Sequence, residues 1–416
     1  MLPIEPLRYS SSLREIPIAE TLRRARRVAA DLGVSRLTEV TYLDRVGVPV
    51  FVAIRPDAQP GSLCVSAGKG LLPEEAQVGA LMECIELAWA EHGRAALPTR
   101  WVRTRDLLNG AVRAFPAPGE PVPGFLALAP HRGQHIDTGA EVLAVSASDL
   151  RSGEVLPVPA ETIFHPLPAT CGGARYYGTG TNGLASGNTE DEATLHALSE
   201  VIERDITSFH LVRDGGIRVA AETLPPRIAT LYGALLEHGF DLVVRYLPNA
   251  FGLPCFTAVL FDRFQPELTL RGDGCHPNRE IALVRAVTET IQCRLSLIHG
   301  GRDDLVNVYA PFLARSAAEK QAIYERELQR LMTPDCTSYA ALPDPAPQLT
   351  SIVAGIDILT SALASVGLER VLKVRYTPSD YPVVVLRILV PGLECHSRDN
   401  ARVGPRLRRF RSSLHA

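Results

Sequence analysis

Three glutamates lie on one face of a predicted helix that spans residues 190–210. Apolar residues recur there at intervals of three and four positions, which favours a helix, and Thr189 is a suitable N-cap with Glu192 as its capping-box partner. At about 100° per residue, Glu192, Glu200 and Glu203 share one face among apolar neighbours. Buried carboxylates are costly unless a cation or an arginine neutralises them. The stretch therefore predicts a cation site at the foot of the preceding glycine-rich loop, GTGTNGLASGN.

The same spacing of small, apolar and acidic residues occurs three times in the chain. The three copies are Ala193, Leu198, Glu200 and Glu203; Ala76, Leu81, Glu83 and Glu86; and Ala282, Val287, Glu289 and Gln292. In the first two copies a glycine occupies the same place before the helix, Gly187 and Gly70, and in the third Arg285 comes one turn before the glutamate. Repeats at long and unequal intervals do not indicate a solenoid. We expect three equivalent helices around one centre.

Two kinds of site could use such glutamates. A nucleotide site would use them to hold Mg²⁺, which prefers oxygen ligands. A dinuclear iron or manganese site of the ferritin-like kind would need Glu-x-x-His on two helices, and none of the three copies has this motif. Arg204 and Arg285 beside the carboxylates also suit phosphate, because the guanidinium fork pairs with phosphate oxygens. The residues favour the nucleotide, although GKG at 68–70 is not a Walker A loop.

Composition excludes several other classes of protein. The chain has 416 residues, 46% of them hydrophobic, which is ample for a large core. A net charge of −3 gives no support to a nucleic-acid or membrane partner. The eight cysteines are scattered without a CxxC pair, so we expect neither a zinc site nor a disulfide framework. No leader and no long apolar run is found, and we expect a cytoplasmic protein.

The remaining pattern predicts a mixed α/β (α+β) fold in which sheets pack against the glutamate-bearing helices. We expect helices at 19–32, 316–331 and 352–366, with His196 as a packed helix residue. We expect strands at 39–41, 48–54, 241–248, 255–261 and 381–390, with short strands and loops between 99 and 168. The expected organisation is an N-terminal segment at 1–60, one large domain at 61–395 and a basic, solvated tail at 396–416.

Three blocks of the sequence closely resemble the signature blocks of the YcaO family. They are VSAGKGLLPEEAQVGALMECIELAWAE, TNGLASGNTEDEATLHALSEVIERD and ALVRAVTETIQCRLSLIHGGRDD, and the resemblance extends from about Tyr9 to Gly392. It implies a YcaO-type fold, with 61–395 as the catalytic domain, and an ATP site without a P-loop in which glutamates hold several Mg²⁺ ions.

The resemblance also implies roles for individual residues. The implied Mg²⁺ ligands are Glu83, Glu86, Glu192, Glu200, Glu203 and Glu289. The implied ATP contacts are Arg14, Ser66, Lys69, Asn188, Arg204 and Arg285. Arg204, Arg285 and Glu289 are the implied catalytic residues. Family members usually carry a lysine shortly before the residue that matches Arg14, and this chain has Ser10 there.

YcaO proteins use ATP to phosphorylate the oxygen of a peptide backbone amide after a nucleophile has added to its carbonyl carbon. A Cys, Ser or Thr side chain of the substrate as nucleophile gives an azoline, whereas external sulfide gives a thioamide. Azoline formers generally end in a PxPxP tail, but here the motif is internal, at Pro343 to Pro347, where it reads as a turn. GGRDDL at 300–305 and VPGLE at 390–394 resemble the thioamide-forming subgroup that works with a TfuA-like protein.

The resemblance therefore favours a thioamide-forming enzyme, with an azoline-forming cyclodehydratase as the alternative. Its expected partners are a peptide or protein substrate, a TfuA-like protein, a sulfur donor and a second copy of the chain in a homodimer. A function of another class, a scaffold that binds a peptide without catalysis, stays open. Such a scaffold would be expected to have lost acidic ligands, and this chain retains all six.

Overall fold

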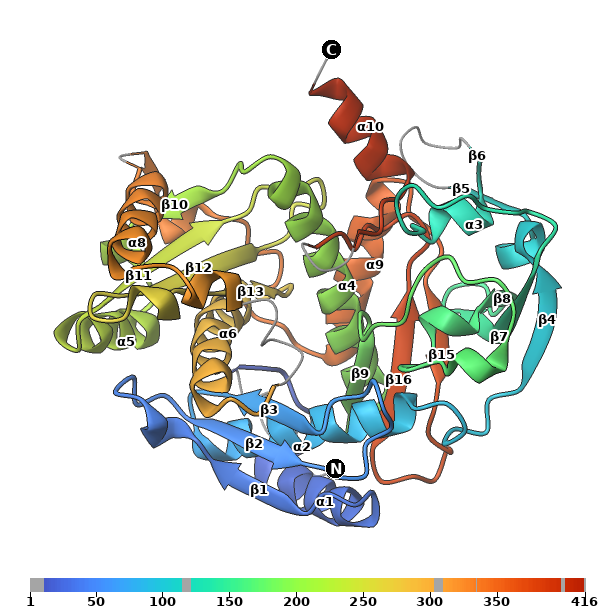
Figure 1. Ribbon diagram of the computed structural model, residues 1–416, viewed down its shortest axis with the longest axis horizontal. Coiled ribbons are helices and arrows are strands. Elements are labelled where there is room, and N and C mark those ends of the chain that lie inside the picture. The colour runs from blue at the N-terminus through green and yellow to red at the C-terminus, as the bar shows by residue number, and fades with distance from the viewer. Residues whose placement is uncertain (1–10, 114–120, 303–309, 334, 398–400, 415–416) are drawn as a thin grey trace.

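The computed structural model describes residues 11–113, 121–302, 310–333, 335–397 and 401–414. The fold is mixed α+β, as predicted: α4 (Glu190–Val212) runs through the middle, and three sheets with their own helices lie around it (Figure 1). Ser10 lies outside the described residues, as does the end of the GGRDDL block. Within the described ranges, no helix has the length and apolar character needed to cross a membrane.

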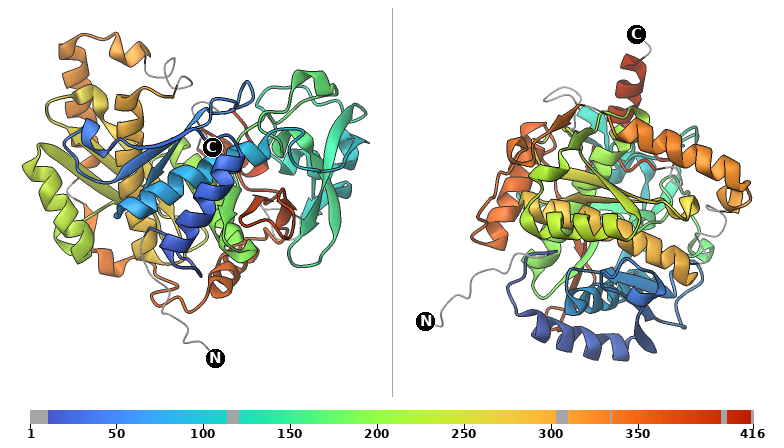
Figure 2. Two further views of the ribbon diagram at one scale, coloured as in Figure 1. Left: turned by 90° about the horizontal axis from the view of Figure 1, so that it is seen from below. Right: turned by 90° about the vertical axis from the view of Figure 1, so that its left-hand side faces the viewer.

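The first sheet is antiparallel and consists of β1 (Arg36–Glu39), β2 (Val50–Ile54) and β3 (Val65–Lys69). α2 (Pro73–Ala90) covers it, and α1 (Ile18–Asp31) packs along α2 (Figure 2). Two of its strands come from the predicted N-terminal segment and one from the predicted catalytic domain. This sheet therefore crosses the predicted boundary at residues 60 and 61.

The second sheet has the strand order β13, β12, β11, β10, β14, and its pairs are antiparallel except the last. Its strands are β10 (Ile217–Val219), β11 (Phe240–Tyr246), β12 (Cys255–Asp262), β13 (Leu270–Cys275) and β14 (Cys336–Thr337). Its helices are α5 (Pro226–Glu237), α6 (Arg279–His299) and α8 (Ala317–Leu331). Alternate residues of a strand face opposite sides, so Leu242 and Val244 share a core with residues of α6, while Val243 packs with Tyr324 of α8. Both faces of this sheet are therefore covered.

The third sheet has the order β4, β7, β15, β16, β9, with β8 paired to β7. Its strands are β4 (Thr99–Arg103), β7 (Glu141–Asp149), β8 (Val155–Pro159), β9 (Leu184–Gly187), β15 (Leu372–Arg375) and β16 (Val384–Leu389). α4 packs against β9 and β16, and α9 (Ile352–Ser365) packs against α4. The smaller elements are the hairpin β5 (Ala111–Arg113) and β6 (Pro121–Pro123), and the one-turn helix α3 (Gly124–Ala127).

The three predicted helix copies are α2, α4 and α6, and each follows a strand that packs directly on it: β3, β9 and β13. Glycine makes this close approach possible. A Cβ atom on Gly68 would lie 2.0 Å from the carbonyl oxygen of Ala76, and one on Gly274 would lie 2.2 Å from that of Ala282. These two glycines stand at the same place in their copies. The repeat in the sequence is therefore a repeated strand and helix unit in which backbone packs on backbone.

Most of the predicted elements are present with shifted ends. The helices expected at 19–32, 316–331 and 352–366 are α1, α8 and α9, and the strands expected at 48–54, 241–248, 255–261 and 381–390 are β2, β11, β12 and β16. The strand expected at 39–41 is β1, which ends at Glu39. The internal PxPxP motif lies in a loop before α9, as predicted.

The prediction of a solvated C-terminal tail is wrong. Residues 405–413 form α10 (Pro405–Ser413), which packs against α4. Arg406 and Leu407 are buried, and Arg406 forms an ion pair with the buried carboxylate of Asp205 on α4. The basic composition misled the prediction because one of its arginines is a buried counter-ion rather than a solvated charge.

Arg406→Ala should destabilise the protein by about 3–5 kcal/mol, because it leaves the charge of Asp205 buried without its partner. Arg409→Ala on the same helix is the matched control, since Arg409 is exposed and its loss should change the free energy of unfolding by at most about 0.5 kcal/mol. Urea denaturation of both variants measures the difference. Equal stability of the two variants would contradict the packed position of α10.

Candidate functional site

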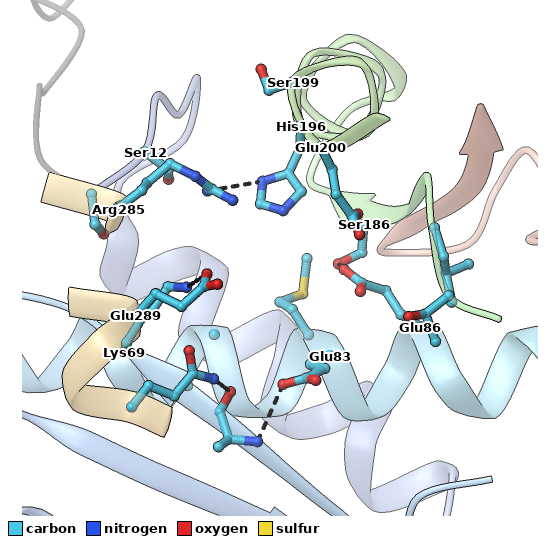
Figure 3. Close-up of a pocket in the computed structure, with 18 of the residues that line it drawn as sticks. Ser12, Lys69, Glu83, Glu86, Ser186, His196, Ser199, Glu200, Arg285 and Glu289 are labelled. Atoms are coloured by element: carbon cyan, nitrogen blue, oxygen red, sulfur yellow. Dashed lines mark hydrogen bonds and ion pairs between the residues drawn. The ribbon is translucent and has the colours of Figure 1, made fainter. Parts of the chain in front are cut away.

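A cavity of about 510 Å³ lies between α2, α4 and α6 (Figure 3). Ten of the predicted site residues line it: Arg14, Lys69, Glu83, Glu86, Glu192, Glu200, Glu203, Arg204, Arg285 and Glu289. Ser66 and Asn188 do not line it. The three glutamate-bearing helices thus surround one centre, as the repeat predicts.

Glu83 and Glu86 enter the cavity from α2. Glu83 Oε2 accepts a hydrogen bond of 3.2 Å from the backbone N–H of Ala67 on β3, and Glu86 Oε1 accepts one of 2.6 Å from the hydroxyl of Ser186 on β9. Burial, together with the charges of Glu83 and Glu200, raises the pKa of Glu86 to about 8 in spite of the hydrogen bond from Ser186. Burial also raises the pKa of Glu83. Both carboxylates therefore lie where a cation would be stabilised.

Glu200 and Glu203 enter from α4. Burial raises the pKa of Glu203 to about 7, and the charge of Glu289 adds to the effect. Burial also raises the pKa of Glu200, although Arg204 Nε lies 4.0 Å from its Oε1. Glu203 Oε2 accepts a hydrogen bond of 3.0 Å from the backbone N–H of Cys275 at the end of β13. This bond fixes one oxygen of Glu203 at the junction of two units.

Glu289 and Arg285 enter from α6, beside Lys69 of β3. Burial opposes ionisation of Glu289, but its ion pair with Lys69 and the charge of Arg204 hold its pKa below the ordinary value. The backbone N–H of Asp273 donates to Glu289 at 3.4 Å, as that of Ala67 does to Glu83 at the same sequence separation. Figure 3 shows Lys69, Arg285 and Glu289 on one wall, with Glu83 and Glu86 on α2. Lys69 and Arg285 therefore lie on a different part of the lining from Glu83 and Glu86.

Glu192 and Asn188 build a support at one end of the cavity. The carboxylate of Glu192 accepts hydrogen bonds from the backbone N–H groups of Glu15 and Asn188, both at 2.7 Å, and from Asn188 Nδ2 at 2.8 Å. Thr189 caps α4 through the N–H of Glu192, as predicted. The predicted capping box does not form, because the Glu192 side chain turns to Asn188 and Glu15 instead of the backbone of Thr189. Glu192 thereby anchors the chain just after Arg14, which also lines the cavity.

Ser66 of β3 is buried and does not itself line the cavity. Gly68 faces the backbone of α2, and alternation along the strand places Ser66 on that same side. Ala67, Gly68 and Lys69, the next three residues, all line the cavity. The role of Ser66 as an ATP contact stays a prediction.

The donor set of the cavity fits Mg²⁺ and phosphate. Carboxylate oxygens are the ligands that Mg²⁺ prefers, and the described residues give Glu86 and Glu203 no ion-pair partner. Among the described residues, no three His, Cys, Asp or Glu side chains converge closely enough to hold one metal ion. Mg²⁺ is usually held by one or two carboxylates together with substrate phosphates rather than by a protein cage. Glutamates spread around a cavity that also contains arginines suit that arrangement.

Sequence reasoning missed several polar residues of the lining. His196, expected to be packed, instead faces the cavity with its Nδ1 3.5 Å from Arg285 Nη1. Burial and the neighbouring cations lower the pKa of His196 well below its ordinary value, so it is neutral. Ser186, His276 and Arg302 also line the cavity. His196 lies one turn before Glu200 on the same helix, and this spacing indicates that both side chains share one face.

The chain matches known proteins along most of its length. Residues 67–394 match the family model described as YcaO cyclodehydratase, ATP- and Mg²⁺-binding. An uncharacterised protein of Methanothermobacter thermautotrophicus is 34% identical, over 95% of this chain and 98% of its own. An uncharacterised protein from the tfuA 3′ region of Rhizobium leguminosarum bv. trifolii is 28% identical, over 92% of this chain and 88% of its own.

A solved structure has the same fold. It is YcaO from Methanopyrus kandleri bound with AMPPCP and Mg²⁺, with a TM-score of 0.72, 26% sequence identity and coverage of 97% of this chain and 98% of its own. The similarity spans the helices that surround the cavity.

Proposed function

Because this chain belongs to the YcaO family, whose domain binds ATP and Mg²⁺, we propose that it uses ATP to activate a peptide backbone amide for thioamide formation. The observation that carries the proposal is the cavity itself, in which glutamates from three helices face arginines and a lysine. A triphosphate with its cations requires this combination of charges. The structure bound with AMPPCP and Mg²⁺ supports the same use of the fold.

We assign the residues of the cavity to two tasks. Glu83, Glu86, Glu192, Glu200, Glu203 and Glu289 would hold Mg²⁺, and Glu192 also forms the support beside Arg14. Bound Mg²⁺ supplies neutralisation of the charge on the triphosphate. Arg14, Lys69, Arg204 and Arg285 would contact the nucleotide and its phosphates, and Asn188 would act through Glu192.

The proposed reaction balances with ATP and sulfide as co-substrates. The sulfur of hydrosulfide adds to the amide carbon, and the former carbonyl oxygen, now negatively charged, takes the terminal phosphoryl group of ATP, which leaves ADP. The bond from carbon to that oxygen then breaks, phosphate leaves with the oxygen, the S–H proton passes to solvent, and the carbon to sulfur double bond of the thioamide forms. Arg204 and Arg285 line the cavity where they can stabilise charge on the transferring phosphoryl group. Neutral His196 beside Arg285 adds no competing charge there.

Support for the thioamide product comes from outside the ATP site. One relative lies in a tfuA 3′ region, and the VPGLE block is present at the end of β16. The PxPxP motif of this chain is internal and lies in a loop. We propose a TfuA-like partner, a separate sulfur donor and a homodimer on the same grounds. The description of the family as a cyclodehydratase keeps azoline formation as the second candidate.

A mass spectrum of the product distinguishes the two reactions. A peptide substrate incubated with ATP, Mg²⁺, sulfide and the partner should gain the mass difference between sulfur and oxygen. An azoline former would instead remove the mass of one water, because a side chain of the substrate is the nucleophile. Omission of sulfide is the control, and it should abolish the gain. A loss of water that does not need sulfide would replace the thioamide proposal with the azoline one.

A further inference from the structure

A second cavity, of about 270 Å³, adjoins the first one along α4. Thr181, Glu200 and Arg204 line both cavities. Glu200 and Arg204 are one turn apart on α4, so they form a boundary that a group in either cavity can reach. A reactant in the second cavity would therefore lie next to phosphate groups held in the first.

Two stretches contribute to the walls of the second cavity. One is the glycine-rich loop at 178–182, of which only Thr181 also lines the first cavity. The other is the VPGLE block, from which Val390 and Leu393 contribute apolar surface. Thr207 of α4 closes the same side. Both stretches therefore line the same cavity, which adjoins the proposed nucleotide site.

The glycine-rich loop is held by hydrogen bonds at Gly178 and at Gly180. Glu161 is buried, and its carboxylate accepts hydrogen bonds from three successive backbone N–H groups, including that of Gly178 at 2.7 Å. Arg387 Nη2 donates to the carbonyl oxygen of Gly180 at 2.7 Å. Between these anchors, the backbone N–H groups of Thr179 and Gly180 have no hydrogen-bond partner among the described residues. A fixed edge with free backbone donors suits another backbone, because main-chain hydrogen bonds do not depend on side-chain identity.

One buried cation in the second cavity suits an oxygen-rich group. Arg387 is 1% exposed and forms no ion pair in the described part of the chain; it donates to backbone carbonyl groups, and its buried Nε has no partner there. Arg204, which is partly exposed and lies 4.0 Å from Glu200, adds a positive charge at the boundary. A buried cation stabilises partial negative charge on a nearby oxygen. The carbonyl oxygen of an amide gains such charge when a nucleophile adds to its carbon.

We propose that the second cavity is the acceptor site, in which a peptide segment lies along the loop at 178–182 and presents one backbone carbonyl to Arg204 at the boundary with the first cavity. The proposal rests on the proposed function, because it places the amide that ATP would activate. It assigns the loop and the VPGLE block to the peptide, and the glutamate cavity to the nucleotide.

Alkylation of Cys395 tests the proposal in the intact chain. Cys395 is partly exposed and lines only the second cavity, whereas Cys64 and Cys336 are exposed and line neither. The probe is N-acetylglycine N-methylamide, a single peptide unit, at rising concentrations up to its solubility limit. It should slow alkylation of Cys395 by iodoacetamide about tenfold when its concentration is about ten times its Kd, and should leave Cys64 and Cys336 unchanged. No slowing, or equal slowing of all three, overturns the proposal.

A filling variant gives an independent result. Thr207→Trp should block the second cavity, so the amide should no longer alter the rate at Cys395, while calorimetric binding of AMPPCP with Mg²⁺ stays unchanged. Leu211→Trp is the matched control, because Leu211 is exposed on the same helix and lines neither cavity. Protection that survives in Thr207→Trp, or loss of nucleotide binding in it, overturns the proposal. A native chain that binds no nucleotide would instead refute the proposed function, whatever happens at Cys395.

Discussion

Glu203→Gln should remove peptide-dependent ATP hydrolysis and leave the fold intact. The glutamine keeps an oxygen that can accept the hydrogen bond from the backbone N–H of Cys275. It also removes a buried charge that is repelled by Glu289, so the protein without ligands should not lose stability. The lost carboxylate would have held Mg²⁺ on the triphosphate, which is a contribution of several kcal/mol, and we expect turnover to fall by roughly 100-fold or more. A phosphate-release assay with the peptide and Mg²⁺ measures it.

The melting temperature of the same variant measures nucleotide binding independently of activity. ATP with Mg²⁺ should raise the melting temperature of the native chain, because it binds only the folded state, and EDTA should abolish the rise. In Glu203→Gln the rise should be smaller, while circular dichroism stays native. Asp191→Asn, an exposed position on the same helix, is the control and should behave as the native chain does. A Glu203→Gln variant with normal turnover would exclude Glu203 as a ligand.

Gly68→Ala should destabilise the protein by about 4 kcal/mol or more, which is among the largest effects of a single substitution. The new Cβ would lie 2.0 Å from the carbonyl oxygen of Ala76 and 2.1 Å from the backbone nitrogen of Ala80. Both atoms are backbone, so no side chain can move aside, and β3 must separate from α2. Lys69 is the next residue of β3 and lines the cavity, so nucleotide binding should weaken together with stability. Urea denaturation followed by calorimetry with AMPPCP and Mg²⁺ measures both.

Gly233→Ala is the matched control for the glycine prediction. Gly233 lies inside α5, and nothing lies within 4 Å of a Cβ atom built on it. Alanine is the better helix former, so this variant should be more stable by up to about 1 kcal/mol. If Gly68→Ala and Gly233→Ala have the same stability, direct backbone packing does not explain the glycines of the repeat.

The predictions that succeeded depend on the periodic spacing of residues along a helix. Those that failed depend on which hydrogen-bond or ion-pair partner a side chain takes. The spacing of Ala193, Leu198, Glu200 and Glu203 fixes a face of a helix whatever lies around it, so three copies led to one cavity. Local spacing does not say whether Glu192 bonds to Thr189 or to Asn188, because both are in reach and Glu15 comes from a distant part of the chain.

A further failure has the same origin. The last helix has only one buried turn, and Arg406 there reads as a surface charge until Asp205 is placed beside it. Contacts between residues about 200 positions apart decide both the tail and the support of Glu192, and no short pattern contains them.

The docking of α10 on α4 has a practical consequence for anyone who designs a minimal fragment of this enzyme. The match to the family model ends at residue 394, and a chain cut there would seem to keep the whole catalytic unit. Such a fragment would lose Arg406, the partner of Asp205, which directly follows Arg204 in the chain. It would also expose the carboxylate of Glu394, which accepts hydrogen bonds from the backbone N–H groups of Gly404 at 2.6 Å and Leu407 at 2.9 Å. Fragments and fusion junctions should therefore be placed beyond residue 413.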